Sequence, residues 1–259
     1  LNVTPDSFSD GSCYFDPGRA VDRALEMEEE GADSIDIGGE STRPFAPPVD
    51  EDEESRRVIP VIERLAGRLR VPISIDTYKA SVAQRAIDAG VEIVNDISGC
   101  TFDPRMFEVV AASAVGLVVM HTRGTPTEMQ RNTSYTAVVP EIIRFLRERL
   151  SAASAAGISL ARVVVDPGIG FGKSVQGNLE ILRKLESFAV LSRPLLIGTS
   201  RKTFIGKILD REVGDRGFGT AATIALSVAK GASILRVHDV RAMRDVALLA
   251  DAIVRSSTD

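Results

Sequence analysis

The chain has 259 residues, of which 44% are hydrophobic, and a formal net charge of −5 at pH 7. A chain of this length and composition buries one large core, so we expect a single domain over residues 1–259. It contains no basic run of the kind that follows a phosphate backbone and no apolar run near the roughly 20 residues that cross a bilayer, so we expect neither nucleic acid nor a membrane as a partner.

The two cysteines, Cys13 and Cys100, lie far apart and outside any CxxC pattern. This spacing argues against a disulfide framework or a thiolate metal cluster and favours a cytoplasmic location. Because the chain begins at Leu1 rather than at a methionine, we expect a few residues to precede it.

Apolar, strand-like runs that end in a polar or charged cluster recur along the chain. They lie at residues 1–3, 34–44, 73–77, 93–99, 118–124, 163–173, 195–202 and 234–239. Helical patterns separate them, at residues 16–30, 51–69, 81–89, 104–113, 140–156, 178–188, 217–230 and 241–255. The repeat averages about 32 residues, which is the size of a βα unit.

Strands at 116–120 and 163–166 are apolar on consecutive residues, which indicates parallel strands buried on both faces. Eight strands, each followed by a helix, predict an α/β fold: a single (β/α)8 TIM barrel with long active-site loops after strands 1, 2 and 5. These loops span residues 4–15, 39–50 and 122–136. An open doubly wound sheet is the alternative, but its GxGxxG turn after the first strand is absent. In a barrel the polar strand ends meet at one rim, which is where such folds carry out chemistry.

The first loop is rich in oxygen ligands and contains neither histidine nor thiolate ligands. Its polar residues are Asn2, Thr4, Asp6, Ser7, Ser9 and Asp10. Such a set suits Mg²⁺ shared with substrate phosphates, and the alternative is an ordinary turn rich in Asx and serine.

Asp76 and Asn95 end neighbouring strands, and Asp166 ends a buried strand before the loop GIGFGK. A carboxylate beside an amide matches the donor and acceptor edge of a heterocycle, so these residues predict a site for a flat, nitrogen-rich ring. Each residue alone could equally be a loop or helix cap. The loop is not a nucleotide phosphate motif, because Pro167 stands where that motif needs glycine.

Lys202, Arg236 and His238 end the seventh and eighth strands, where barrels frequently bind phosphate. The other histidine, His121, also ends a strand, and a buried core histidine is the alternative for both. Alternation turns Arg201 away from the ring interior, so we expect it to be a structural salt-bridge partner.

The motifs at residues 1–11, 31–44, 74–77, 94–99, 166–173, 198–202 and 236–240 occur in order and together resemble the dihydropteroate synthase family of the folate pathway. The resemblance covers nearly the whole chain. It implies condensation of 6-hydroxymethyl-7,8-dihydropterin diphosphate with 4-aminobenzoate, giving 7,8-dihydropteroate and diphosphate, with Mg²⁺ as the cofactor. It also implies a homodimer, for which the helices at residues 221–229 and 246–254 could supply an interface or instead pack on the barrel.

The resemblance assigns roles to residues of the rim. It implies that the pterin is held by Asp76, Asn95, Asp166 and Lys202, with Phe171 as a further substrate-binding residue. Arg236 would stack on the pterin ring and, with His238 and Asn2, bind diphosphate and Mg²⁺. The loops that would close over the aminobenzoate carry Asp6, Phe8, Asp10, Thr42, Arg43 and Pro44, with Ser200 near its carboxylate. The expected catalytic residues are Asp76, Lys202, Arg236 and Asp10.

The chain departs from the family pattern at three positions. Phe45 stands where the family usually has glycine, Cys100 where glycine is commoner, and Thr122 where methionine is commoner. Phe45 would either narrow the aminobenzoate entrance and alter sulfonamide sensitivity, or point to solvent from its loop. His121, Thr122 and Arg123 have no assigned role.

Two other functions compete with the synthase. Methyltetrahydrofolate-binding methyltransferases share the barrel and the pterin-reading groups but need no diphosphate site. A catalytically silent pterin-binding paralogue would keep the same fold.

Overall fold

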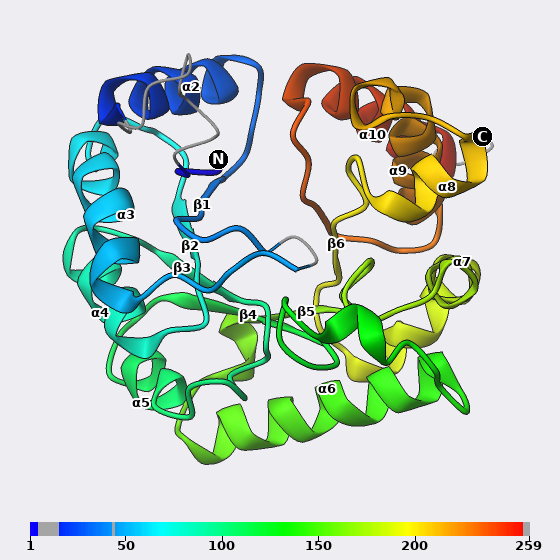
Figure 1. Ribbon diagram of the computed structural model, residues 1–259, viewed down its shortest axis with the longest axis horizontal. Coiled ribbons are helices and arrows are strands. Elements are labelled where there is room, and N and C mark those ends of the chain that lie inside the picture. The colour runs from blue at the N-terminus through cyan, green and yellow to red at the C-terminus, as the bar shows by residue number, and fades with distance from the viewer. Residues whose placement is uncertain (5–15, 43–44, 256–259) are drawn as a thin grey trace.

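Parallel strands in sequential order form the centre of the molecule in a computed structural model, which describes residues 1–4, 16–42 and 45–255 (Figure 1). The strands are β1 (Ile35–Ile37), β2 (Ile73–Asp76), β3 (Ile93–Asp96), β4 (Gly116–Met120), β5 (Val163–Asp166), β6 (Leu196–Ile197) and β7 (Ile234–Leu235). Hydrogen bonds between successive strands join β1, β2, β3, β4 and β5 into one sheet, and β6 and β7 into another. A bridge between Val165 and Leu195 connects the two sheets.

A bridge between Asn2 and Gly38 places the N-terminal segment beside β1, so that this segment is the first strand of the sequence prediction and β1–β7 are strands two to eight. The strand order never reverses. This excludes the doubly wound alternative, because the strand order of that fold reverses at a switch point. The predicted (β/α)8 fold is confirmed. Among the described residues, no backbone hydrogen bond joins β7 to the segment at Asn2.

Helices surround the strands (Figure 1). They are α2 (Pro17–Glu29), α3 (Glu51–Leu65), α4 (Ala80–Asp88), α5 (Met106–Ala111), α6 (Val138–Ala155), α7 (Val175–Arg183), α8 (Thr203–Leu209), α9 (Gly217–Ala229) and α10 (Val240–Arg255). Short 3-10 helices are η1 (Met129–Arg131), η2 (Leu160–Arg162), η3 (Leu185–Leu191) and η4 (Val213–Asp215). The predicted helix at 178–188 is instead α7 followed by η3, and α8 was not predicted because seven residues carry too little helical periodicity.

Capping residues explain where several helices begin. Asp16 accepts a hydrogen bond from the Gly18 N–H at 2.8 Å, and Asp50 accepts one from the Glu53 N–H at 2.8 Å. Ser174 accepts one from the Gly177 N–H at 3.0 Å. Each cap satisfies a donor that the first helical turn leaves without a partner, so the helix that follows each loop begins at a defined residue.

Apolar side chains from the strands and from the inner faces of the helices form one large buried cluster. Ile37, Ile75 and Leu117 fill it from the strands, and Ile62 and Leu146 from α3 and α6. The polar residues at the carboxyl ends of the strands are therefore carried on a packed base. Within the described residues, no helix combines the length and the apolar character that a membrane crossing requires.

Candidate active site

Polar side chains at the ends of β2, β3 and β5 lie at one rim, as the sequence predicted. Asp76 and Asn95 are direct partners in the register of β2 and β3. Asp166, at the end of β5, pairs in register with Met120 of β4. All three polar side chains are buried. The strand ends of the sheet thus gather hydrogen-bonding groups where water has little access.

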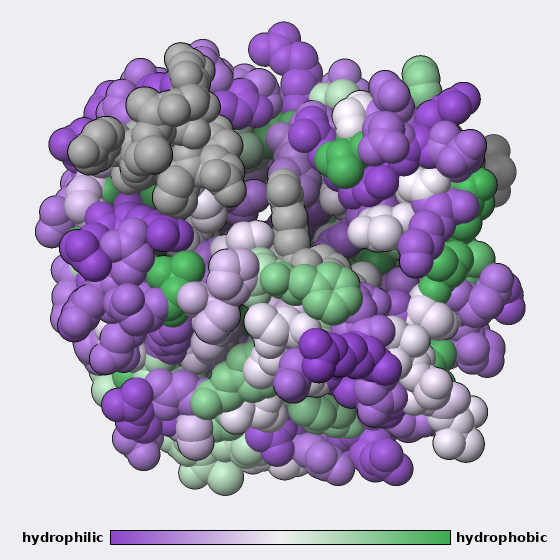
Figure 2. Space-filling model, in the orientation of Figure 1, coloured by the Kyte–Doolittle hydropathy of each residue, from purple (hydrophilic) through white to green (hydrophobic). Residues whose placement is uncertain are grey.

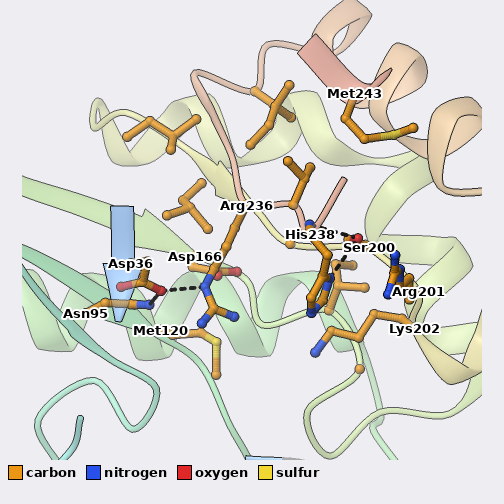
Figure 3. Close-up of a pocket in the computed structure, with 18 of the residues that line it drawn as sticks. Asp36, Asn95, Met120, Asp166, Ser200, Arg201, Lys202, Arg236, His238 and Met243 are labelled. Atoms are coloured by element: carbon orange, nitrogen blue, oxygen red, sulfur yellow. Dashed lines mark hydrogen bonds and ion pairs between the residues drawn. The ribbon is translucent and has the colours of Figure 1, made fainter. Parts of the chain in front are cut away.

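Arg236, which directly follows β7, reaches across the rim to two carboxylates. Its Nε donates to Asp36 Oδ2 at 2.5 Å, and its Nη2 donates to Asp76 Oδ2 at 2.6 Å. The same Asp36 oxygen accepts a hydrogen bond from Asn95 Nδ2 at 3.1 Å. Figure 3 shows Arg236 between this group and the side chains of His238, Ser200 and Lys202.

Asp36 was not among the predicted site residues, although it connects Arg236 with Asn95. It stands in the middle of β1, between Ile35 and Ile37. An acidic residue inside a short parallel strand was the signal that could have identified it, because such strands are normally apolar throughout.

The two carboxylates beside Arg236 differ in the direction of their pKa shifts. Burial, together with the charge of Asp36, raises the pKa of Asp76 to about 7, against the opposing effect of Arg236. Burial also acts to raise the pKa of Asp36, but Arg236 and a hydrogen bond from Ser74 hold it below its usual range. The Oδ1 atom of Asp76 is buried and has no hydrogen-bond partner among the described residues, so it can accept a donor.

The Asp166 carboxylate is fixed by the loop that follows β5. Its Oδ1 accepts a hydrogen bond from the Gly168 N–H at 2.6 Å. Burial raises the pKa of Asp166 to about 6, opposed by that hydrogen bond and by the charges of Lys202 and Lys173. Gly168 has φ of 71°, and a Cβ there would lie 2.0 Å from the His121 carbonyl oxygen, so only glycine fits.

Phe171 and three other apolar residues form a small cluster at the rim. The others are Ile97, Met120 and Met129. The Nζ of Lys202 lies 4.1 Å from the centre of the Phe171 ring. Burial and the charge of Arg236 lower the pKa of Lys202 to about 8. Of this set, the sequence identified only Phe171 and Lys202, because an apolar wall has no sequence signal of its own.

Ser200 and His238 contact each other beside Lys202. Ser200 Oγ lies 2.9 Å from His238 Nδ1 and accepts a hydrogen bond from the His238 N–H at 3.3 Å. Desolvation and the charges of Arg236 and Arg201 lower the pKa of His238. Arg201 forms an ion pair with Asp239, which confirms its predicted structural role.

These residues border a cavity of about 1780 Å³, and Figure 2 shows the surface hollowed near the middle of the face that it presents. The cavity is larger than the roughly 300–1,000 Å³ of a typical small-molecule site, because it continues past the rim to Met27 of α2 and Met243 of α10. Asp36, Asn95 and Asp166 line it, whereas Asp76, which accepts a hydrogen bond from Arg236, is not among the lining residues.

Asn2, Thr42 and Phe45 also line the cavity. Seven further predicted residues lie outside the described residues: Asp6, Ser7, Phe8, Ser9, Asp10, Arg43 and Pro44. No group of three or more His, Cys, Asp or Glu side chains that could hold a metal occurs in residues 1–4, 16–42 and 45–255. Asn2 borders the cavity that Arg236 and His238 also line, which suits a Mg²⁺ ion held mainly by phosphate oxygens and water.

Comparison with known proteins shows which proteins the whole chain resembles. A family model described as "Pterin binding enzyme" matches residues 1–238. The dihydropteroate synthase of Bacillus subtilis is 49% identical over 98% of this chain and 87% of its own length. Two solved structures of the Xanthomonas albilineans dihydropteroate synthase also match. The structure with 4-aminobenzoic acid has a TM-score of 0.93 at 43% identity and covers 99% of this chain and 92% of that one. The complex with 7,8-dihydropteroate has a TM-score of 0.89 at 41% identity, with coverage of 99% and 92%.

Proposed function

Because this chain belongs to the dihydropteroate synthase family of pterin-binding enzymes, we propose that its rim residues bind the two substrates of that family in the roles that follow. The chain is a transferase that condenses 6-hydroxymethyl-7,8-dihydropterin diphosphate with 4-aminobenzoate, giving 7,8-dihydropteroate and diphosphate. The observation that carries the assignment of roles is that Asn95, Asp166 and Lys202 border the same cavity as Arg236 and His238.

The pterin ring binds in this proposal to the ends of β3 and β5. The Asp166 carboxylate accepts two adjacent ring N–H groups, the Asn95 amide meets a ring donor and a ring acceptor, and Lys202 donates to a ring acceptor. Phe171 supplies an apolar surface beside the pterin ring. The support is that the Phe171 ring lies next to Lys202 Nζ. Asp76 becomes accessible to the ring when Arg236 moves from it toward the diphosphate.

The diphosphate binds between the ends of β6 and β7 and the N-terminal segment. Arg236 and His238 provide donors there, and Asn2 would hold Mg²⁺ together with the diphosphate oxygens. The support is that all three side chains line the cavity. Mg²⁺ would supply additional neutralisation of the leaving group.

The C–O bond to diphosphate breaks with its electron pair leaving on oxygen, which forms a pterin-methyl cation. Asp76 and Asp36 stabilise that cation. The support is that two carboxylates share the single guanidinium of Arg236, which leaves a net negative charge when both are ionised. The aminobenzoate nitrogen then attacks the methylene carbon and loses a proton. An arylamine is mostly unprotonated at pH 7, so it needs positioning more than deprotonation.

The aminobenzoate lies in this proposal under the loops after strands one and two. Phe8, Asp10, Thr42, Arg43 and Pro44 surround it, with Ser200 near its carboxylate. The support among the described residues is that Thr42 and Ser200 both line the cavity.

The assembly and location of the protein are also proposals. We propose a homodimer formed through α9 and α10, supported by their exposed apolar residues Leu226, Leu249 and Ile253. We propose a cytoplasmic location, supported by the free, buried thiol of Cys100.

Diphosphate release measured with and without 4-aminobenzoate tests the function. We expect release from the dihydropterin diphosphate substrate only when both the amine and Mg²⁺ are present. A methyltransferase would release no diphosphate under either condition. A silent paralogue would bind the pterin without turnover, and either result would overturn the assignment.

A further inference from the structure

The amino group of Lys173 is buried at the end of the loop that follows β5, where it makes three hydrogen-bond contacts. Its Nζ lies 2.8 Å from the Phe171 carbonyl oxygen, 3.2 Å from the His121 carbonyl oxygen and 3.0 Å from His121 Nδ1. We propose that Lys173 and His121 are positioning residues that fix residues 167–173 for pterin binding, an inference that rests on the proposed function.

The hydrogen bonds define how this pair works. Nζ donates to the two carbonyl oxygens, because a carbonyl oxygen can only accept. The third contact joins Nζ directly to the imidazole of His121 through Nδ1. The imidazole is held in place by the edge-to-face contact with Phe145, whose ring centre lies 4.9 Å away. His121 is thus a fixed hydrogen-bond partner for Lys173.

The segment after β4 holds the same loop by its other carbonyl groups. Gln130 Nε2 donates to the Gly170 oxygen at 2.8 Å, and the Tyr135 hydroxyl donates to the Gly172 oxygen at 2.9 Å. Together with the Lys173 contact, these hydrogen bonds engage the three consecutive carbonyls of Gly170, Phe171 and Gly172. His121, which had no role in the sequence analysis, and the predicted loop at residues 122–136 therefore both contact the neighbouring loop.

The loop carries two groups that meet the pterin in the proposed function. Asp166 is oriented by the Gly168 N–H, and the Phe171 ring lies under Lys202 Nζ. The Lys173 bond to the Phe171 carbonyl fixes the backbone that carries this ring. A displacement near 1 Å at such a site can cost about a hundredfold in rate, so we expect loss of Lys173 to act on pterin binding without any direct contact with the pterin.

Lys173→Met removes the three hydrogen bonds while keeping the apolar stem of the side chain. We expect the dissociation constant for 6-hydroxymethylpterin, measured by calorimetry, to rise about tenfold or more. The KM for the dihydropterin diphosphate should rise similarly, while the KM for 4-aminobenzoate at saturating pterin changes less than about twofold.

Arg162→Met is the matched control. Arg162 Nη1 donates to the carbonyl oxygens of Ser113 and Val115, both at 2.9 Å, at the opposite ends of β4 and β5. This variant also removes a cation from backbone carbonyls, but it should leave pterin affinity unchanged even if thermal stability falls. Equal losses of pterin affinity in both variants would show a general effect of stability and overturn the positioning role.

Substitutions of His121 provide the second test. Asn places an amide oxygen near the position of Nδ1, so His121→Asn should retain most of the pterin affinity that His121→Leu loses. If both variants bind the pterin like wild type, the proposal is wrong. If wild type itself binds no pterin, the proposed function fails instead, so the two failures are distinguishable.

Discussion

At the scale of single residues, Asp36, Asp76 and Arg236 behave as one charged unit. Arg236 donates to both carboxylates, and the pair of acids leaves an excess of negative charge when both are ionised. Because burial raises the pKa of Asp76 to about 7, that residue can change its charge near neutral pH. A unit of this kind is suited to a cation that exists only during the reaction.

The protonation of His121 gives a prediction for stability. Burial and the charges of Lys173 and Arg123 lower its pKa to about 2, from an ordinary value of 6.5. The stability that the neutral ring contributes is fully present above pH 6.5 and is lost as the pH falls below it, because the unfolded chain then binds the proton. The unfolding free energy of wild type relative to His121→Asn should therefore fall by about 1.4 kcal/mol per pH unit below that point.

Urea unfolding of both proteins at pH 7, 6 and 5 measures this difference. The other titrating groups are the same in both chains, so their effects cancel to first order. A difference in unfolding free energy that does not change with pH would contradict the assigned protonation.

Phe45 gives a second prediction. Its φ is 66°, and the φ of Cys100, the other position where the family resemblance leads to glycine, is 61°. Phe45 is also 63% exposed, so its ring gains little by burial. Phe45→Gly should raise the unfolding free energy by about 0.5–1 kcal/mol, because relief of the left-handed strain exceeds the extra freedom of glycine in the unfolded chain.

Phe45→Ala is the control, since it removes the ring but keeps the Cβ that causes the strain, and it should show no gain. An equal gain in both variants would assign the effect to the ring instead. The same variants test sulfonamide sensitivity: identical inhibition constants in wild type and Phe45→Gly would reject the idea that the ring narrows the entrance.

At the scale of elements, the loop between β1 and α3 is closed at its two ends by one carboxylate. Glu40 Oε2 accepts from the Val49 N–H at 3.1 Å and from Lys79 Nζ at 2.5 Å, and Oε1 accepts from the Tyr78 hydroxyl at 2.7 Å. Lys79 also pairs with Glu54 of α3. These contacts fix the loop that carries Thr42 to the end of β2.

Glu40→Gln should loosen this loop. The glutamine NH2 group would replace one acceptor oxygen and face one of the three donors, so that at least one hydrogen bond to this side chain is lost. We expect the unfolding free energy to fall by about 1–3 kcal/mol and the KM for 4-aminobenzoate to rise more than the KM for the pterin substrate. Glu54→Gln removes a partner of the same lysine without touching Val49, so it should not change the KM for 4-aminobenzoate. Equal effects of both variants on that KM would refute the anchoring role of Glu40.

The elements differ in how far the sequence could predict them. Asp76, Asn95 and Asp166 come at the ends of short strand-like segments, and the parallel register brings such strand ends together. The contact of Lys173 with His121 joins residues 52 positions apart, so no local pattern indicates it. Likewise, Asp36 lies in a strand of three residues, too short for a clear periodicity.

At the scale of the whole molecule, the sequential strand order gives the two halves of the rim different side chains. The ends of β2, β3 and β5 present carboxylate and amide groups, whereas the ends of β6 and β7 present Lys202, Arg236 and His238. Arg236 crosses between the halves. The order of the chain segments could be predicted from the sequence. The contacts of Arg236 with Asp36 and Asp76 could not, because they join residues 200 and 160 positions apart.

The outer surface of the barrel gives the last prediction. In α9 only Thr220, Ile224 and Ser227 are buried, and in α10 only Val240 and Met243 are, among the residues that the structure describes. Leu226 is 57% exposed, Leu249 65% and Ile253 67%, and Figure 2 shows apolar residues along the edge where Figure 1 places α8 and α9. Apolar residues in such number on adjacent helices are typical of an interface, and the proposed homodimer would bury them against a second copy of the chain.

Sedimentation equilibrium at micromolar concentration should therefore give twice the 27.8 kDa mass of one chain for wild type. Leu226→Glu combined with Leu249→Glu should give a monomer, because each glutamate would be desolvated within the interface. Val190→Glu is the control, since Val190 is 60% exposed but lies on η3, outside the proposed face. A monomeric wild type would reject the dimer, and a dimer that survives the double substitution would place the interface elsewhere on the barrel.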